Sequence, residues 1–261
     1  MPLPPLLAVL RCTGAETPSA FTQEYGIAPL EVSDAYGVTK DGDGVCKGCR
    51  VPRVSLSIQC FEPHLECASH VIPDGFPLNV SDVLSNGFAE RSVLITPRIV
   101  ALGESLESYP AGKDSDLVVS SASVREELSK VSLTEAFDSI MIRVSEVYLP
   151  RNPGTANISE WPYLTVDCAN FLNSRFSHYR TNAPSVERRV SHGGMWSHCA
   201  FFGVDALLRD AKNPEAIESR TIGELFHIPD SIQDGEYTLV CPFVEMNLDC
   251  ALTVPLLYPK T

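Results

Sequence analysis

Cys46-Lys47-Gly48-Cys49, followed by Cys60-Phe61-Glu62-Pro63-His64-Leu65-Glu66-Cys67-Ala68-Ser69-His70, is the most distinctive stretch of the chain. It holds four of the nine cysteines and two of the six histidines, whereas the remaining cysteines are scattered singly. Thiolates and imidazoles are the ligands that a tetrahedral zinc ion prefers. The clustering therefore predicts that one zinc ion binds this segment and fixes its fold.

Six side chains in this segment compete for the four positions of such a site. The Cys-x-x-Cys pair can turn two sulfurs onto one ion, and Gly48 permits the tight backbone between them. The later His-x-x-Cys spacing mirrors the first pair, and Pro63 fixes the backbone just before it. Cys60 and His70 stay open as replacements for one of the choices. The predicted metal ligands are Cys46, Cys49, His64 and Cys67.

Three other interpretations of the cysteines compete with structural zinc. Disulfides need an oxidising compartment, and an odd count of nine leaves at least one thiol unpaired. A redox Cys-x-x-Cys motif should open a helix, whereas residues 50–54 are typical of a strand. Ordinary core thiols are common, but Cys46 follows the polar turn Asp41-Gly42-Asp43-Gly44. With four protein ligands the zinc would have no open position, so we expect a structural site and no enzymatic activity.

Composition limits the class of protein. The 261 residues, of which 44% are hydrophobic and 20% charged, suffice for one large domain or two lobes. The net charge of −13 repels phosphate backbones, so nucleic-acid binding is not expected. No run of 18 apolar residues occurs, which argues against membrane insertion. We expect a chain of cytosolic origin with reduced thiols.

Twenty prolines and 16 glycines divide the chain into short pieces, which disfavours a helical bundle. Helices are expected at Val124–Val131 and Met195–Ala211, the second ended by Asn213-Pro214. The predicted fold class is α+β, two-lobed and β-rich with short helices, with a zinc-bearing small lobe at 1–90 and a larger β-rich lobe at 91–261. Runs rich in β-branched and aromatic residues predict strands at 51–59, 92–102, 117–124, 139–149, 163–168, 237–244 and 251–257.

The metal region resembles the outer-capsid clamp, or protector, proteins of turreted reoviruses, including those of aquareoviruses. Those proteins carry a structural zinc site near the N-terminus, built from Cys-x-x-Cys and a closely spaced His and Cys. The matching text here is Val45-Cys46-Lys47-Gly48-Cys49 and Pro63-His64-Leu65-Glu66-Cys67, with a similar start, Met1-Pro2-Leu3, and a similar length. The family spacing places one residue between His and Cys, whereas two lie between His64 and Cys67.

The resemblance implies a structural role on a virion. Such a protein would lie in the outer capsid, after assembly in the host cytoplasm, and clamp a membrane-penetration protein beside neighbouring copies of itself. Proteolysis would remove it during entry. Structural zinc contributes about 10–16 kcal/mol in small zinc peptides, so the small lobe would depend on the ion.

Two alternatives belong to other classes. One is a zinc-stabilised intracellular adaptor that binds another protein. The other is a hydrolase with Cys199 as nucleophile, because His198 and His192 lie close to it in the sequence. Sequence proximity does not establish contact between these side chains, and a core thiol beside a turn is the better explanation of Cys199.

Overall fold

The computed structural model describes, with side chains, residues 63–72, 78–84, 89–131, 136–149, 161–191, 193–209 and 217–260. It also describes the backbone of strands at 8–9, 31–36, 39–40, 46–47 and 50–55. The chain divides into two compact units. The first contains residues 1–13, 62–151 and 159–261, and the second contains residues 14–61 and 152–158. The division into lobes 1–90 and 91–261 stays a prediction.

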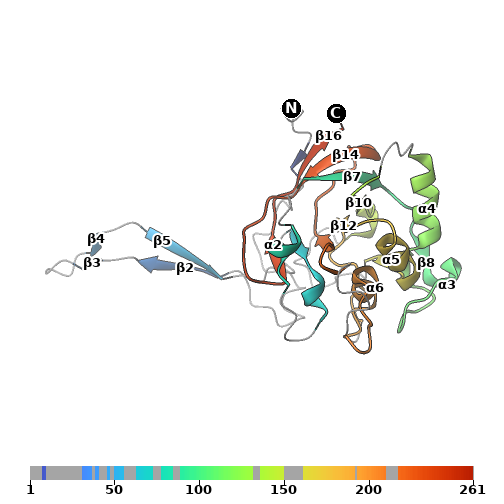
Figure 1. Ribbon diagram of the computed structural model, residues 1–261, viewed down its shortest axis with the longest axis horizontal. Coiled ribbons are helices and arrows are strands. Elements are labelled where there is room, and N and C mark those ends of the chain that lie inside the picture. The colour runs from blue at the N-terminus through green and yellow to red at the C-terminus, as the bar shows by residue number, and fades with distance from the viewer. Residues whose placement is uncertain are drawn as a thin grey trace. The chain divides into compact units, whose positions relative to one another are not determined.

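A nine-stranded sheet forms the centre of the first unit, in the order β1-β16-β14-β7-β10-β12-β13-β6-β15 (Figure 1). The four strands β7, β10, β12 and β13 run parallel, and antiparallel strands extend the sheet on both sides. The strands are β1 (Ala8–Val9), β6 (His64–Glu66), β7 (Ala89–Ile95), β10 (Ser139–Ile142), β12 (His178–Thr181), β13 (Thr221–Glu224), β14 (Gly235–Val240), β15 (Cys250–Leu252) and β16 (Leu256–Pro259).

The parallel strands are buried on both faces, as expected where other elements cover both sides of a sheet. All four residues of β10 (Ser139-Ile140-Met141-Ile142) are fully buried, and so are Val93, Leu94 and Ile95 of β7. β6 is also fully buried along its three residues. Polar residues in this strand therefore lie in the interior of the unit.

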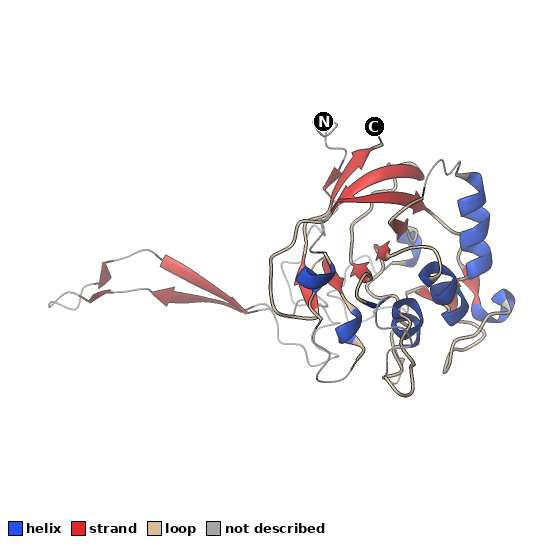
Figure 2. Cartoon of the chain, viewed as in Figure 1, coloured by secondary structure: helices blue, strands red, loops and turns tan. Residues whose placement is uncertain are grey.

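Three helices lie along one side of the unit, and the middle one, α5, contacts both α4 and α6 (Figure 2). α4 (Ser121–Lys130) and α5 (Val166–Asn173) begin at Ser120 and Thr165, whose hydroxyls accept hydrogen bonds from backbone N–H groups three residues on. α6 (Trp196–Phe202) is shorter than the predicted helix 195–211, because Gly203 adopts a φ of 77° and ends it. Shorter helical pieces are η2 (Ala68–His70), α2 (Val80–Val83), α3 (Leu102–Ser105) and η3 (Glu146–Tyr148).

A second sheet of the first unit has the order β11-β9-β8, formed by Tyr163–Leu164, Leu117–Val119 and Val100–Ala101. Leu102, Tyr109, Val118 and Tyr163 form a small separate core against it. In the second unit, β2 (Glu31–Tyr36) pairs antiparallel with β5 (Arg50–Ser55), and β3 (Thr39–Lys40) pairs antiparallel with β4 (Cys46–Lys47). The α+β class and the β-rich character are confirmed, whereas a zinc-stabilised N-terminal lobe is not shown.

A buried ion pair crosses the main sheet. Arg180 of β12 is fully buried and donates to Glu90 of β7, which is 3% exposed. The same guanidinium donates to the carbonyls of Tyr179 and Thr221 at 3.0 and 3.1 Å. Gly223 leaves room for this side chain, since a Cβ there would lie 2.7 Å from Cδ of Arg180. Among the described residues, no helix combines the length and the apolar character that a membrane span needs.

Candidate metal centre

The short strand β6 brings two metal-ligating side chains to the same face of the sheet. Successive strand residues point to opposite faces, so His64 and Glu66 share one face and Leu65 lies on the other. The antiparallel register places His64 directly opposite Glu224 of β13. The three side chains are at most 4% exposed, and Nε2 of His64 lies 3.3 Å from Glu66 and 3.7 Å from Glu224.

Helix α6 adds a second imidazole to these carboxylates. His198 lies in the first turn of α6, and its Nε2 atom is 3.2 Å from Glu66 and 3.5 Å from Glu224. Glu66 therefore faces both histidines, His64 through Oε1 and His198 through Oε2. Two hydrogen bonds hold the carboxylate of Glu224 in place. Its Oε1 atom accepts from the Ser185 hydroxyl at 3.1 Å and from the Val186 N–H at 2.8 Å.

The orientation of the His198 ring is set by Glu187. Oε1 of Glu187 lies 3.1 Å from Nδ1 and also accepts the backbone N–H of His198 at 2.8 Å. Tyr109 donates its hydroxyl to the other oxygen of Glu187. A carboxylate at Nδ1 keeps the proton on that nitrogen, so Nε2 is the nitrogen that faces the cluster and that would release its proton to bind a cation.

His70 is the most accessible histidine of the group, with 21% of its side chain exposed. It ends the short helix η2, and its Nδ1 atom lies 3.0 Å from Asp249, just before β15. Its Nε2 atom lies 3.7 Å from Glu66, and its ring centroid is 5.6 Å from that of His198. This imidazole therefore lies between the buried carboxylates and solvent.

The cluster has a strongly negative electrostatic potential. Burial alone would lower the pKa of His64, but the hydrogen bonds to Glu224 and Glu66 outweigh it and raise the pKa to about 10. Burial likewise opposes protonation of His198, yet Glu187, Glu224 and Glu66 raise its pKa well above the usual value. A potential that holds protons this firmly also favours a divalent cation.

The donor atoms fit a divalent ion. Two groups have ligand atoms within 4.8 Å of one another, namely His64, Glu66 and Glu224, and Glu66, His70 and His198. Ligand atoms about 2.1 Å from a tetrahedral ion lie roughly 3.4 Å apart, and the separations around Glu66 and Glu224 range from 3.2 to 3.7 Å. Mixed imidazole and carboxylate donors suit Zn²⁺ and Mn²⁺.

Of the two predicted zinc ligands whose side chains the structure describes, His64 lies in this cluster and Cys67 does not. The thiol of Cys67 instead contacts the Ser69 hydroxyl at 3.1 Å and the Leu78 carbonyl at 3.4 Å, and burial raises its pKa to about 11. Cys49, the replacement ligand Cys60 and the side chain of Cys46 lie outside the described residues. The four-ligand set therefore stays a prediction, and the other replacement ligand, His70, borders the new cluster.

Glu66, Glu187 and Glu224 were not predicted as members of a site, and His198 was considered only as a partner of Cys199. The spacing His64-x-Glu66-x-x-x-His70 carried a signal, since alternate residues of a strand share a face. Cys199 is not exposed as a nucleophile would be. It is fully buried, and burial raises its pKa even though Arg209 Nη1 lies 3.1 Å from the sulfur. The His198 ring next to it in sequence is directed at Glu187 and Glu66.

No known family model matches the chain, and no curated protein matches its sequence. Solved structures share its fold. Isatin hydrolase A from Labrenzia aggregata has a TM-score of 0.61 at 14% identity, covering 97% of this chain and 93% of that one. Isatin hydrolase A from Ralstonia solanacearum has a TM-score of 0.57 at 10% identity, covering 99% and 90%. A potential metal-dependent hydrolase with cyclase activity has a TM-score of 0.53 at 13% identity, covering 89% and 99%.

These likenesses overturn the reovirus resemblance. The chain has the fold of metal-dependent hydrolases and isatin hydrolases over nearly its whole length, whereas the resemblance rested on a few residues of its first quarter. The predictions of an outer-capsid clamp, of a virion location and of a protein without enzymatic activity are therefore wrong. The adaptor alternative gains no support. The expected partners, a penetration protein and neighbouring copies, rested on that resemblance and are untested.

Proposed function

We propose that the chain is a metal-dependent hydrolase that cleaves an amide or ester bond, with cyclic amides as the first substrate class to test. The observation that carries the proposal is the convergence of His64, Glu66, His198 and Glu224 in the interior of the unit, beside the partly exposed His70. The fold shared with isatin hydrolases supports the choice of bond.

We assign His64, Glu66, His198 and Glu224 as the residues that hold a divalent ion, either Zn²⁺ or Mn²⁺. When bound, such an ion supplies Lewis acidity, which polarises an acyl oxygen and acidifies water. Glu187 positions His198 and acts through it. These carboxylates and imidazoles are buried, so they need little rearrangement to bind a cation.

His70 is assigned as the general base and acid. Asp249 holds its Nδ1 atom, and together with Glu66 it raises the pKa of the imidazole against the effect of burial. His70 accepts a proton from the attacking water, and it returns that proton to the leaving nitrogen or oxygen as the acyl bond breaks. The products are a carboxylate and an amine or alcohol, which remain joined when the substrate is cyclic.

Metal content tests the first part of the proposal. Purified wild-type protein should contain Zn²⁺ or Mn²⁺ by elemental analysis, and His198→Ala should lose the equivalent that the cluster binds. His227→Ala is the matched control, because His227 has no contact with the cluster and the same side chain is removed. A full metal complement in His198→Ala would exclude the assigned ligands.

Turnover tests the second part. The metal-loaded enzyme should open a cyclic amide, with isatin as the first probe, and the reaction can be followed by the change in absorbance. His70→Gln should abolish turnover while it keeps the metal. Normal turnover by His70→Gln would exclude the assigned base.

The predicted zinc set of Cys46, Cys49, His64 and Cys67 stays a proposal of its own, which competes with the assigned cluster for His64. If it exists, the His198→Ala protein retains one equivalent of zinc, and a further Cys46→Ser, Cys49→Ser change removes it. An unchanged metal content after that change would exclude this zinc set.

A further inference from the structure

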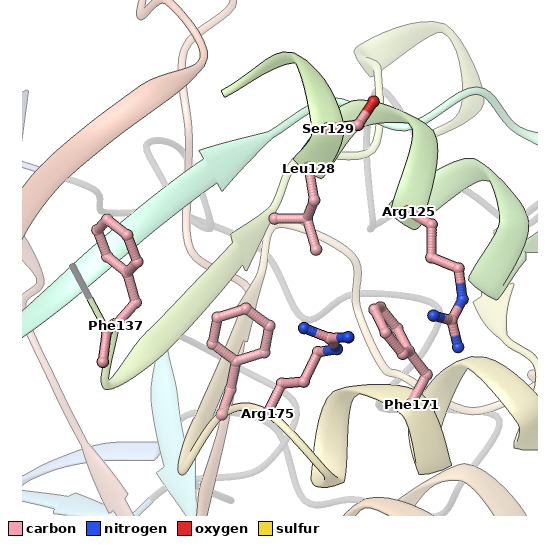
Figure 3. Close-up of a pocket in the computed structure, with 8 residues that line it drawn as sticks. Arg125, Leu128, Ser129, Phe137, Phe171 and Arg175 are labelled. Carbon is pink, nitrogen blue, oxygen red and sulfur yellow. The ribbon is translucent and has the colours of Figure 1, made fainter. Parts of the chain in front are cut away.

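A pocket of about 540 Å³ lies between α4, α5 and the residues before β10, and it shares no residue with the candidate metal centre. This volume is within the range of small-molecule sites. Figure 3 shows side chains of both helices directed toward it. Its lining consists of Arg125, Leu128, Ser129, Ala136, Phe137, Phe171, Arg175 and Phe176.

Three phenyl rings and a leucine provide the apolar part of the lining. Phe171 and Phe176 are only 8% and 7% exposed, so packing on the core cluster fixes their positions. Leu128 and Phe137 are partly buried and pack against the same core. Fixed rings favour a flat apolar ligand, since little side-chain freedom is lost when it binds.

Two guanidinium groups flank one of these rings. The Cζ atom of Arg125 lies 3.8 Å from the centroid of the Phe171 ring, and that of Arg175 lies 4.9 Å from it. Figure 3 shows the Phe171 ring between the two groups. Both arginines are exposed, and stacking on an aromatic ring holds a guanidinium in a defined plane from which its N–H groups can bind an anion.

No carboxylate of the described residues forms an ion pair with either guanidinium. The acidic residues of α4, Glu126 and Glu127, contact Lys130 instead. Within the described part of the chain, two cations without an acidic partner therefore line one apolar pocket, and this arrangement favours an anionic ligand.

We propose that this pocket is a second ligand site, which binds a small organic anion composed of an aromatic body and a carboxylate group. The phenyl rings and Leu128 contact the aromatic body, and Arg125 and Arg175 bind the carboxylate. The proposal does not depend on the metal centre, because none of its residues belongs to that cluster.

Calorimetric titration with 2-naphthoate and 2-naphthamide tests the proposal, because the two probes share a body and differ in charge. Naphthoate should bind at least about tenfold more tightly than naphthamide, as charge-assisted hydrogen bonds to arginine are stronger than neutral ones. Its affinity should fall with added salt, whereas that of naphthamide should change little. Equal affinities, or no binding of naphthoate, would overturn the proposal.

Variants localise the binding. Arg125→Gln combined with Arg175→Gln should weaken naphthoate binding about tenfold and leave naphthamide binding unchanged. Lys130→Gln, on the same helix but outside the pocket, is the control for lost positive charge. Naphthoate bound equally well by the double variant would place the anion elsewhere and refute the site. Both arginines are exposed, and a thermal melt verifies that the variant folds.

Discussion

One oxygen of Glu187 holds both the backbone and the ring of His198: Oε1 lies 2.8 Å from the backbone nitrogen and 3.1 Å from Nδ1. The backbone contact fixes the start of α6, and the ring contact fixes the direction of Nε2. The position of the nitrogen that faces the carboxylate cluster is therefore coupled to the position of a helix end, through Glu187.

Replacing Glu187 with Gln should weaken metal binding without removing a ligand. The neutral amide lacks the charge that holds the proton on Nδ1 of His198 and can present its NH2 group there instead, and loss of such a partner typically costs about 10- to 100-fold in metal affinity. Titration against a chelator of known affinity measures the change. Glu146→Gln, at an exposed position on η3, is the matched control. An unaltered affinity in Glu187→Gln would remove this positioning role.

Removing one charge of the buried ion pair between Arg180 and Glu90 should strongly lower the free energy of unfolding. Glu90→Gln leaves the guanidinium buried without a full counter-charge, and such losses amount to about 3–5 kcal/mol. Urea denaturation measures the free energy of unfolding. The double variant Glu90→Leu, Arg180→Met removes both charges and should be less destabilised than Glu90→Gln. A double variant that is less stable than the single one would contradict this explanation.

Gly223→Ala should destabilise the sheet by crowding. The new Cβ would lie 2.7 Å from Cδ of Arg180 and 2.8 Å from Cζ of Phe226, both in the interior. Overpacking of this kind typically costs about 1–3 kcal/mol. Thermal and urea unfolding measure the cost. A second change, Phe226→Leu, frees space beside the methyl group, so the double variant should lose less stability than the sum of the two single changes. Strict additivity would show that Phe226 is not the obstacle.

His178 should make stability depend on pH. Burial, with a smaller contribution from Arg180, lowers its pKa to about 4, and its Nδ1 atom contacts the Thr221 hydroxyl at 2.9 Å. The unfolded chain takes up the proton near pH 6.5 and the folded chain only near pH 4, so stability is lost as the pH falls between these values. At pH values below 4, the free energy of unfolding is lower by about 3 kcal/mol because of this histidine.

The variant His178→Asn tests this effect, because it keeps a polar group but does not titrate. The difference in unfolding free energy between wild type and variant should shrink as the pH falls from 6.5 to 4, measured by urea denaturation at several pH values. A pH-independent difference would show that His178 does not titrate in this range.

The sequence indicated the β-rich α+β class because strand-length runs of β-branched residues, such as Ser139–Leu149, are local signals. It could not indicate the parallel centre of the sheet, since β10 pairs with β7 and β12 across long intervening segments. Gly203 is a local signal that a helix ends. The apolar spacing of the residues after it nevertheless led to a predicted helix that continued to Ala211.

His64 was predicted to be a metal ligand, but the neighbours that suggested this role are not the ones that surround it in the structure. The cysteines around it suggested a soft-metal site, whereas its described neighbours are the carboxylates of Glu66 and Glu224. Glu224 and His198 lie far from His64 in sequence, and only the pairing of β6 with β13 and the placement of α6 bring them together. The spacing of neighbouring residues in the sequence cannot predict contacts between residues so far apart in the chain.

The alternation of faces along β6 makes the cluster intolerant of length changes there. Deleting or adding one residue between His64 and Glu66 would rotate one of them to the side that Leu65 occupies, and would exchange a charged group for an aliphatic one in a dry interior. Natural variants of this chain should therefore vary the identity of residues in this strand far more readily than their number.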